Sequence, residues 1–220
     1  MSAPTFSILV TFAVPQEAAG FRRAYRRCPN VNTVVTGMGK AGVNRTLERL
    51  DRLENPRVMI TAGFAGALSS NLCLGDVVYD RDTEFGEKSV FQALGALPVK
   101  FATSDHVLVD APSKKRFGLN SGGEAVDMES SYLRQWASER GIPSATVRAI
   151  SDEADEDLPL NFNEFVTGSG GFNYPKLMWR LAARPVLIPK LIMFSKRTNY
   201  AGERLSHVLN GLVAHWINRA

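Results

Sequence analysis

Residues 57–67 read RVMITAGFAGA and combine an apolar run with a glycine-rich segment. The run from Arg57 to Ala62 is short and rich in residues that favour strands. Two similar runs precede it, at residues 6–13 and 33–36, and each is followed by a stretch that favours a helix. This order of strand, helix, strand, helix and strand predicts an α/β fold with a mostly parallel sheet buried at its centre.

The rest of the chain adds further elements to this core. Apolar runs predict four more strands, at residues 77–79, 99–102, 125–128 and 145–150. A helix after the third of these is expected to end near Arg140, because Gly141 suits the position that follows a helix. We therefore expect a three-layer αβα sandwich with a central mixed, mostly parallel sheet.

The C-terminal part has a helical pattern from Phe162 onward. Prolines are expected to divide it into separate pieces, because proline breaks the interior of a helix. These prolines are Pro175, Pro185 and Pro189. No repeat or linker interrupts the sequence, so we expect a single domain over residues 1–220, in which residues 168–220 form a helical C-terminal extension.

The composition is that of a globular protein with a small excess of positive charge. The 220 residues include 26 Lys and Arg against 22 Asp and Glu, a formal charge of +4, and two cysteines, Cys28 and Cys73. Nothing else points to secretion, so these are expected to be reduced thiols. No run reaches the roughly 18 to 20 apolar residues of a membrane span, and the N-terminal segment is unlike a signal peptide. We therefore expect a cytoplasmic protein.

The basic residues gather in two places. Four arginines lie within residues 22–27, and six basic residues lie between Phe165 and Gly202, a stretch without an acidic residue. The spacing of a zinc finger, a helix-turn-helix signature and the aromatic motif of RNA-binding strands are all missing from the sequence. We therefore expect no nucleic-acid partner.

Polar residues follow several predicted strands, notably Glu17, Glu129, Arg148 and Asp152. In open α/β sheets, ligands bind beyond the carboxyl ends of the strands, where such side chains converge. Each residue alone has an ordinary explanation, as an acid at a helix N-terminus or as half of an ion pair. Together they would bind a polyhydroxy ligand by charge-assisted hydrogen bonds, and a protonated carboxyl group among them would act as a general acid.

Several segments resemble the motifs of one family. They are TAGFAGAL at residues 61–68 with LGDVV at 74–78, AVDMES at 125–130 and VRAISD at 147–152. In order and spacing they are similar to the purine and uridine phosphorylase superfamily, which includes the methylthioadenosine/S-adenosylhomocysteine nucleosidases. The resemblance extends from about residue 6 to residue 165 and implies cleavage of the N-glycosidic bond of a nucleoside.

The resemblance also implies roles for individual residues. Asp152 falls on the general acid that protonates N7 of a purine, and Ser151 would orient its carboxyl group. Glu129 and Met128 fall on the pair that binds the ribose. The other expected members of the nucleoside pocket are Phe162, Leu108, Val109, Phe64, Ala65 and Gly66. The resemblance implies a small-molecule nucleoside as partner, with neither a cofactor nor a metal.

The nucleophile is either water or phosphate. Phosphorylases of the family hold phosphate with an early Gly-Asp-Pro-x-Arg loop and with an Arg and a Ser beside the glycine segment, where this chain has Thr61 and Phe64. Glu17 falls instead where nucleosidases keep the carboxylate that positions water with Glu129 and Arg148, and it would repel phosphate. We expect hydrolysis of an adenine-type nucleoside, with a phosphorylase or an inactive nucleoside-binding protein as the alternatives.

The C-terminal extension has two interpretations. Residues 176–197 mix apolar side chains with spaced cations. They form either a helical cover, packed on the core or on a second subunit, or a basic amphipathic surface that meets anionic lipid. The extension and the AVDMES segment are also similar to the hopanoid-associated branch of the family, in which the nucleoside carries a lipid at its 5′ carbon. The family resemblance further implies a homodimer.

Overall fold

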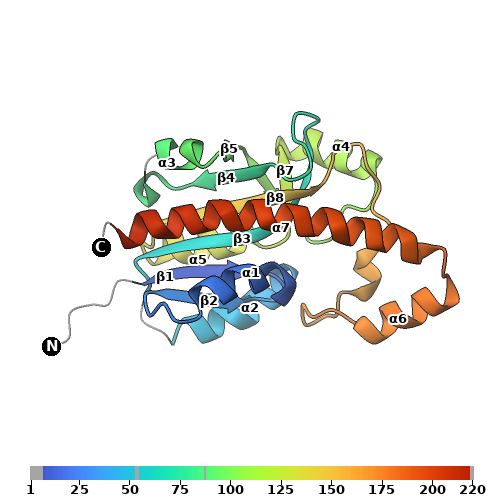
Figure 1. Ribbon diagram of the computed structural model, residues 1–220, viewed down its shortest axis with the longest axis horizontal. Helices are drawn as coiled ribbons and strands as arrows, with labels where there is room; N and C mark the ends of the chain where they lie inside the picture. The colour runs from blue at the N-terminus through green and yellow to red at the C-terminus, as the bar shows by residue number, and fades with distance from the viewer. Residues whose placement is uncertain (1–6, 53–54, 87, 219–220) are drawn as a thin grey trace.

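The computed structural model describes residues 7–52, 55–86 and 88–218, so residue 6 of the first predicted strand lies outside the described residues. An eight-stranded sheet has the strand order β2-β1-β3-β8-β4-β5, and β7 and β6 continue it from one end of β3 (Figure 1). The strands are β1 (Ile8–Phe12), β2 (Val31–Val35), β3 (Val58–Ala67), β4 (Val77–Arg81), β5 (Leu97–Pro98), β6 (Phe101–Thr103), β7 (Ala125–Asp127) and β8 (Ser144–Asp152). Within this described sheet, only the pairs β3–β7 and β4–β8 are antiparallel. The prediction of a mixed, mostly parallel sheet is therefore confirmed.

Helices cover both faces of the sheet. They are α1 (Pro15–Tyr25), α2 (Gly39–Leu50), α3 (Lys88–Ala93), α4 (Ala111–Ser121), α5 (Ser130–Glu139), α6 (Tyr174–Ala183) and α7 (Leu187–Ile217), with short 3-10 helices at Thr83–Phe85 and Phe162–Phe165. Helices α1 and α7 share one hydrophobic cluster with the sheet, whereas α2 and α5 contribute to a separate cluster. The three-layer αβα sandwich is therefore also confirmed.

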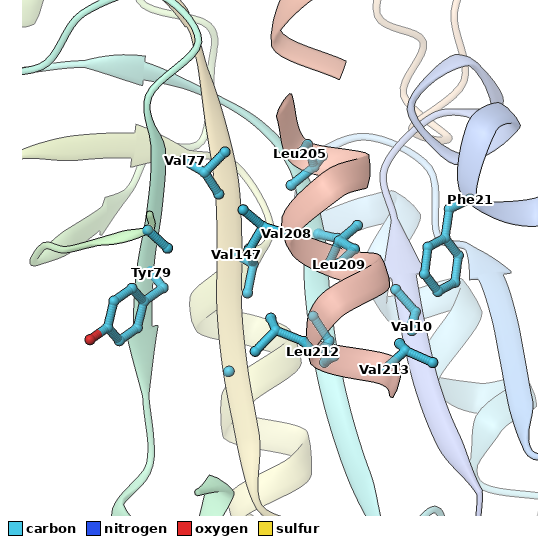
Figure 2. Packing of buried hydrophobic residues seen from close by; sticks show 14 of the residues in the cluster. Val10, Phe21, Val77, Tyr79, Val147, Leu205, Val208, Leu209, Leu212 and Val213 are labelled. Carbon is cyan, nitrogen blue, oxygen red and sulfur yellow. The ribbon is translucent and has the colours of Figure 1, made fainter. Parts of the chain in front are cut away.

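The C-terminal half of α7 is a central part of the core. Its buried residues recur at helical spacing and face β1, β4 and β8 (Figure 2). They are Ala201, Leu205, Val208, Leu209, Leu212 and Val213. Burial of such a face contributes roughly 1.5 to 3 kcal/mol for each large apolar side chain. The end of the chain therefore stabilises the sheet itself.

The prediction that Pro189 divides the extension was wrong. Helix α7 runs without a break from Leu187 to Ile217 and contains Pro189 as its third residue. The first N–H groups of a helix have no partner within it, so proline is tolerated there. Pro185 does separate α6 from α7, and Pro175 lies in the first turn of α6.

The strand predicted at residues 99–102 overlaps β6, and a separate short strand, β5, lies just before the predicted range. β5 pairs with β4, whereas β6 pairs with β7. Val99 donates its N–H to Tyr79 O, beside β5. Lys100 accepts the N–H of Glu124, beside β7, and donates its own N–H to the Glu124 carboxylate. The chain passes from pairing with β4 to pairing with β7 between Val99 and Lys100, so β5 and β6 are separate strands.

The third predicted strand is longer than expected. It was predicted to end at Ala62, but β3 continues through the glycine segment to Ala67. This segment stays paired with β8 as far as Gly66, opposite Asp152, with a register shift between Ala65 and Gly66. It also pairs with β7. Partners on both sides hold the glycine segment in the sheet, so it does not form a loop.

Candidate active site

A cavity of about 550 Å³ lies where β3, β7 and β8 end, and helices α6 and α7 close its other side. Ten of the twelve predicted site residues line it: Glu17, Phe64, Ala65, Gly66, Leu108, Met128, Glu129, Ser151, Asp152 and Phe162. The structure places Val109 on a smaller neighbouring cavity, and Val107 lines the larger one. Arg148 lies behind the wall of the larger cavity, as its contacts show.

Glu17 lies in the first turn of α1, where its carboxylate accepts three backbone hydrogen bonds. Oε2 accepts from the N–H groups of Ala13 (3.0 Å) and Val14 (3.2 Å), and Oε1 accepts from that of Phe64 (2.9 Å). Burial raises the pKa of Glu17, while the charge of Arg148 and these hydrogen bonds oppose the rise. Glu17 thus joins the start of α1 to β3 and presents a buried carboxyl group at the cavity.

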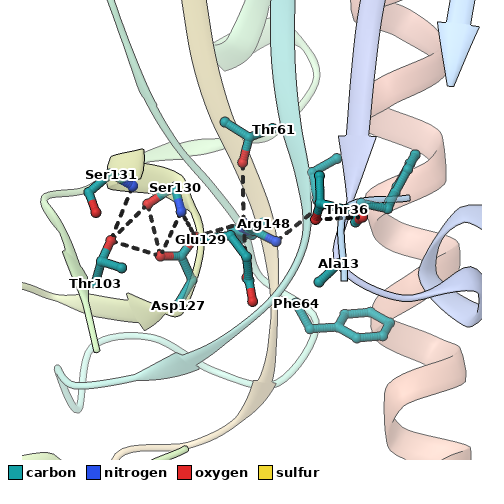
Figure 3. A network of polar contacts seen from close by, with 12 residues as sticks. Ala13, Thr36, Thr61, Phe64, Thr103, Asp127, Glu129, Ser130, Ser131 and Arg148 are labelled. Carbon is teal, nitrogen blue, oxygen red and sulfur yellow. Dashed lines mark hydrogen bonds and ion pairs between the residues drawn. The ribbon is translucent and has the colours of Figure 1, made fainter. Parts of the chain in front are cut away.

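Arg148 projects from the middle of β8 and is 1% exposed. Its guanidinium lies 2.7 Å from Asp127 Oδ2 and 3.6 Å from Glu129 Oε2, and it donates to Ala62 O and Thr61 Oγ1. Figure 3 shows Arg148 within this network. Burial opposes its charge, but the facing carboxylates, Asp127 foremost, raise the pKa of Arg148. Arg148 therefore compensates a buried group of carboxylates.

Glu129 precedes α5 but binds the N-terminus of another helix. Its Oε1 accepts the N–H of Gly39, the first residue of α2, at 2.7 Å. Burial raises the pKa of Glu129 to about 7; Arg148 opposes this rise, and the charges of Asp127 and Glu17 add to it. Glu129 therefore changes its charge near neutral pH.

Two glycines of β3 make room for the charged groups. A Cβ at Gly63, whose φ is +149°, would lie 2.3 Å from Nη1 of Arg148 and 2.8 Å from Oε1 of Glu17. A Cβ at Gly66 would lie 3.0 Å from Oδ2 of Asp152. Any larger residue would displace these side chains, so both glycines serve close approach within a strand rather than a turn.

Asp152 is the last residue of β8, which was predicted to end at Ile150. Both of its carboxylate oxygens have partners. Ser151 Oγ donates to Oδ1 at 2.7 Å, and Oδ2 lies 2.5 Å from Nζ of Lys114, a buried residue of α4. Pairing of β8 with β3 and these two contacts fix the orientation of the carboxyl group.

The far side of the cavity is apolar. Leu177 of α6 and Leu191 and Phe194 of α7 line it, and the Phe194 ring lies 5.5 Å from that of Phe162, between centroids. Phe64 lines the cavity too, and its ring lies close to Gly202 of α7. Phe64 therefore narrows the site from the sheet side, while Phe162 and Phe194 form one aromatic wall.

Several residues of this site were not predicted from the sequence. Asp127 is part of the AVDMES segment, but no role was predicted for it. Its carboxylate pairs with Arg148 and accepts hydrogen bonds from the N–H and the hydroxyl of Ser130. Lys114 stands in a Lys-Lys-Arg run, which in a sequence looks like a solvated surface. The spacing of Leu191 and Phe194 indicates one helix face but not that the face borders a cavity.

Among the described residues, no group of three or more His, Cys, Asp and Glu side chains is arranged to hold a metal ion. In the same part of the chain, every helix is either too short or too polar to span a bilayer.

Comparison with known proteins identifies relatives of this chain. A family model described as the phosphorylase superfamily matches residues 96–170. A 5′-methylthioadenosine/S-adenosylhomocysteine nucleosidase of Haemophilus ducreyi is 30% identical over 171 residues, which cover 62% of this chain and 73% of the relative. The nucleosidase of the same description from Glaesserella parasuis is 29% identical over 167 residues, 60% of this chain and 71% of that one. The chain belongs to the phosphorylase superfamily, and its relatives there include nucleosidases.

Solved structures share the fold at lower sequence identity. The futalosine hydrolase of Helicobacter pylori superposes with a TM-score of 0.68 at 14% identity and covers 96% of this chain and 98% of its own. The S-adenosylhomocysteine nucleosidase of Streptococcus pyogenes, in complex with 5-methylthiotubericidin, gives 0.66 at 18% identity, with 97% and 98% covered. The resemblance to a nucleosidase of this superfamily, inferred from the sequence, is confirmed.

Proposed function

We propose that this protein hydrolyses the N-glycosidic bond of a purine nucleoside of the adenine type. The observation that carries the proposal is the placement of charged groups at two points along β3. Glu17 and Arg148 approach the strand at Gly63, and Asp152 approaches it at Gly66. Three residues of a strand span roughly 10 Å, which leaves room for a ribosyl group and a water molecule between the acid and the other carboxylates.

Each group has a role in this reaction. Asp152 delivers a proton to the purine, so that the base leaves as a neutral molecule. Glu129 accepts hydrogen bonds from the ribose hydroxyls, and Glu17 orients the attacking water. Both carboxylates also stabilise the positive charge that develops on the ribose as the bond breaks. Arg148 lies behind the cavity wall, where its positive charge acts on both Glu129 and Glu17, and it serves as a positioning residue.

Water suits the site better than phosphate as the nucleophile. Of the described residues that line the cavity, only Lys114 and His106 are basic, and Lys114 is paired with Asp152 at the opposite end from Glu17. Thr61, beside the glycine segment, is already bonded to Arg148. The carboxylates of Glu17 and Glu129 would repel a phosphate dianion.

Release of free base from adenosine, measured with and without phosphate, tests this proposal. We expect ribose as the product and no requirement for phosphate. Asp152→Asn should lower kcat by about 10²- to 10⁴-fold, because it removes the group that protonates the base. Asp155→Asn, an exposed neighbour, is the matched control and should leave the rate unchanged. Ribose 1-phosphate as the product, or full activity of Asp152→Asn, would contradict the proposal.

The apolar side of the cavity supports a substrate with an apolar 5′ substituent. Leu177, Leu191 and Phe194 provide no charged group to that end of the site. We therefore propose an adenosine whose 5′ substituent is a thioalkyl group or a larger lipid.

The outer side of α6 and α7 supports contact with an anionic membrane surface. Trp179, Val186 and Met193 are 70%, 73% and 62% exposed. Arg184, Lys190 and Lys196 lie among them, and within the described residues no ion pair involves these three cations. Exposed aromatic and apolar side chains beside free cations suit the interface of a bilayer that contains anionic lipid.

Flotation with liposomes of phosphatidylcholine and phosphatidylserine tests this contact. We expect the triple substitution of Arg184, Lys190 and Lys196 by Gln to abolish flotation. The same substitution of Arg22, Arg23 and Arg26, which are exposed cations of the first helix and its end, should not. Equal flotation of both variants would exclude the membrane contact. If only the first triple variant changes the sedimentation coefficient and neither floats, the surface belongs to the homodimer expected from the family.

A further inference from the structure

Lys114 is a lysine buried beside the proposed general acid. It lies in the first half of α4 and is 1% exposed, whereas the adjacent Lys115 and Arg116 are exposed. Its Nζ lies 2.5 Å from Oδ2 of Asp152, and the side chain lines the cavity. Burial of an ammonium group costs free energy unless the group is paired. The position of Lys114 at the end of the cavity where the proposed reaction takes place therefore suggests a role in that reaction.

Nζ of Lys114 has three oxygen neighbours. Besides Asp152, Nζ donates to the backbone carbonyls of Glu153 (2.8 Å) and Glu156 (2.9 Å). The side chains of these glutamates are bonded elsewhere, Glu153 to the N–H of Leu74 and Glu156 to Arg197. Two backbone carbonyls and one carboxylate oxygen therefore surround Nζ, an arrangement that suits the three donors of an ammonium group.

Both oxygens of Asp152 have a neighbour that can donate a proton. Oδ2 lies 2.5 Å from Nζ of Lys114, and Oδ1 accepts from the hydroxyl of Ser151 at 2.7 Å. A carboxyl group with a donor beside each oxygen is well placed to receive a proton from one of them. The sequence led us to expect a protonated carboxyl group as the acid, and the structure adds a buried amino group in contact with that carboxyl group.

We propose that Lys114 supplies, through Asp152, the proton that the leaving base takes up, an inference that rests on the proposed nucleosidase function. As the bond between the base and C1′ breaks, its electron pair stays on the purine. A ring nitrogen of the purine takes a proton from Asp152, and Asp152 takes one from Nζ of Lys114. Lys114 is left as a neutral amine, and it regains a proton from solvent through the open cavity once the base has left.

The remaining atoms balance in the same cycle. Water adds its oxygen to C1′ and gives one proton to Glu17, which returns it to solvent. Ser151 can follow the change at Asp152, because its hydroxyl also lies 3.3 Å from the carbonyl of Ala65 and can turn there when the carboxyl group is protonated. No co-reactant beyond water is needed.

A purely structural role for Lys114 makes a different prediction. Its bonds to Glu153 and Glu156 anchor the segment after β8, and loss of that anchor would slow the cleavage of every substrate alike. A proton donor matters only where the leaving group needs a proton. A nitrophenolate leaves as a stable anion, whereas a purine does not, so the two leaving groups separate the roles.

Lys114→Met and Lys114→Arg, with Lys115→Met as the matched control, test the inference on adenosine and on 4-nitrophenyl β-ribofuranoside. Arg keeps the charge and the hydrogen bonds but does not release a proton. We expect both Lys114 variants to cleave adenosine about 10²-fold more slowly, and to cleave the nitrophenyl riboside within about threefold of the wild-type rate. Lys115→Met should match the wild type on both.

Several results would overturn the inference. An equal loss on both substrates, or recovery of adenosine cleavage in Lys114→Arg, would assign Lys114 a structural or purely electrostatic role. If the wild type cleaves adenosine but not the nitrophenyl riboside, the comparison of Arg with Met on adenosine decides alone, and equal loss supports proton delivery. If the wild type and Lys115→Met release no base from any nucleoside, the proposed function fails and the inference fails with it.

Discussion

The two ends of the cavity are built differently. At the sheet end, Arg148, Glu129 and Asp152 are buried and bonded to backbone or to one another. At the helix end, Leu191 and Phe194 are only partly buried, on a part of α7 that projects with α6 beyond the sheet (Figure 1). The groups that act on the bond are therefore fixed by the core, while those that contact the 5′ end lie on elements that can vary without disturbing it.

Helix α7 shows the same contrast along its own length. Its C-terminal half buries Leu205, Leu209 and Leu212 against the sheet (Figure 2). Its N-terminal half lines the cavity on one side and exposes Ile192 and Met193 on another. The first half of the helix should therefore tolerate substitutions that the second half does not.

The largest effect is expected at Arg148. Arg148→Met leaves Asp127 and Glu129 without their compensating charge, which should lower the free energy of unfolding by about 3–5 kcal/mol and abolish base release. Arg134→Met is the matched control, because Arg134 pairs with Asp80 and Asp82 nearer the surface and such pairs contribute up to about 1 kcal/mol. Urea denaturation measures the free energy of unfolding of both variants. Equal losses in the two variants would show that the sheet end is no more dependent on its charges than the surface.

The sequence carried the information that positions most of the sheet end. Short apolar runs predicted the strands, and Glu17, Glu129 and Asp152 were found because polar residues at strand ends converge. The third strand was predicted to end at Ala62, before the glycine segment, because glycine is depleted in strands. The partners of these glycines, Arg148 and Asp152, lie far away in the sequence, so the close approach that requires Gly63 and Gly66 was not visible.

Other parts of the site could not be predicted for a different physical reason. Lys114 and Lys115 are neighbours of the same type, and only the orientation of α4 decides that one is buried and the other exposed. Leu191 and Leu205 both suit the apolar face of a helix, yet one borders a cavity and the other the sheet. Periodicity defines a face of a helix, whereas tertiary packing decides what that face meets.

A smaller effect is expected from the titration of Glu129. Its pKa is about 7 in the folded state and near the ordinary 4.5 when unfolded, so the folded state binds more protons between these values. Stability should therefore fall as pH rises from about 4.5 to about 7, by up to about 1.4 kcal/mol per pH unit, and then level off. The raised pKa of Glu17 acts in the same direction.

Glu129→Gln should remove most of this pH dependence. Urea unfolding at pH 5 and pH 8 measures it, and the Gln variant should lose less stability than the wild type between the two. Base release by the wild type should rise with pH through about 7, because the ionised carboxylate is the form that accepts from the ribose hydroxyls. A variant with the wild-type dependence of stability on pH would show that the buried charge lies elsewhere in the cluster.

The smallest effect is expected at the helix end. Phe194→Ala removes one side of the apolar wall that faces the proposed 5′ substituent. It should raise KM for 5′-butylthioadenosine about tenfold and leave kcat unchanged, because this contact is equally strong in the ground state and the transition state. Adenosine, which lacks the substituent, should be cleaved as by the wild type.

Met193→Ala is the control for this substitution, because Met193 precedes Phe194 on α7 but is exposed. Met193→Ala should alter the cleavage of neither substrate. Both variants should have a free energy of unfolding within about 1 kcal/mol of the wild type, since neither side chain lies in the core. If Phe194→Ala lowered kcat for adenosine as well, the helix end would take part in the chemistry. The division between a fixed reacting end and a variable recognition end would then be wrong.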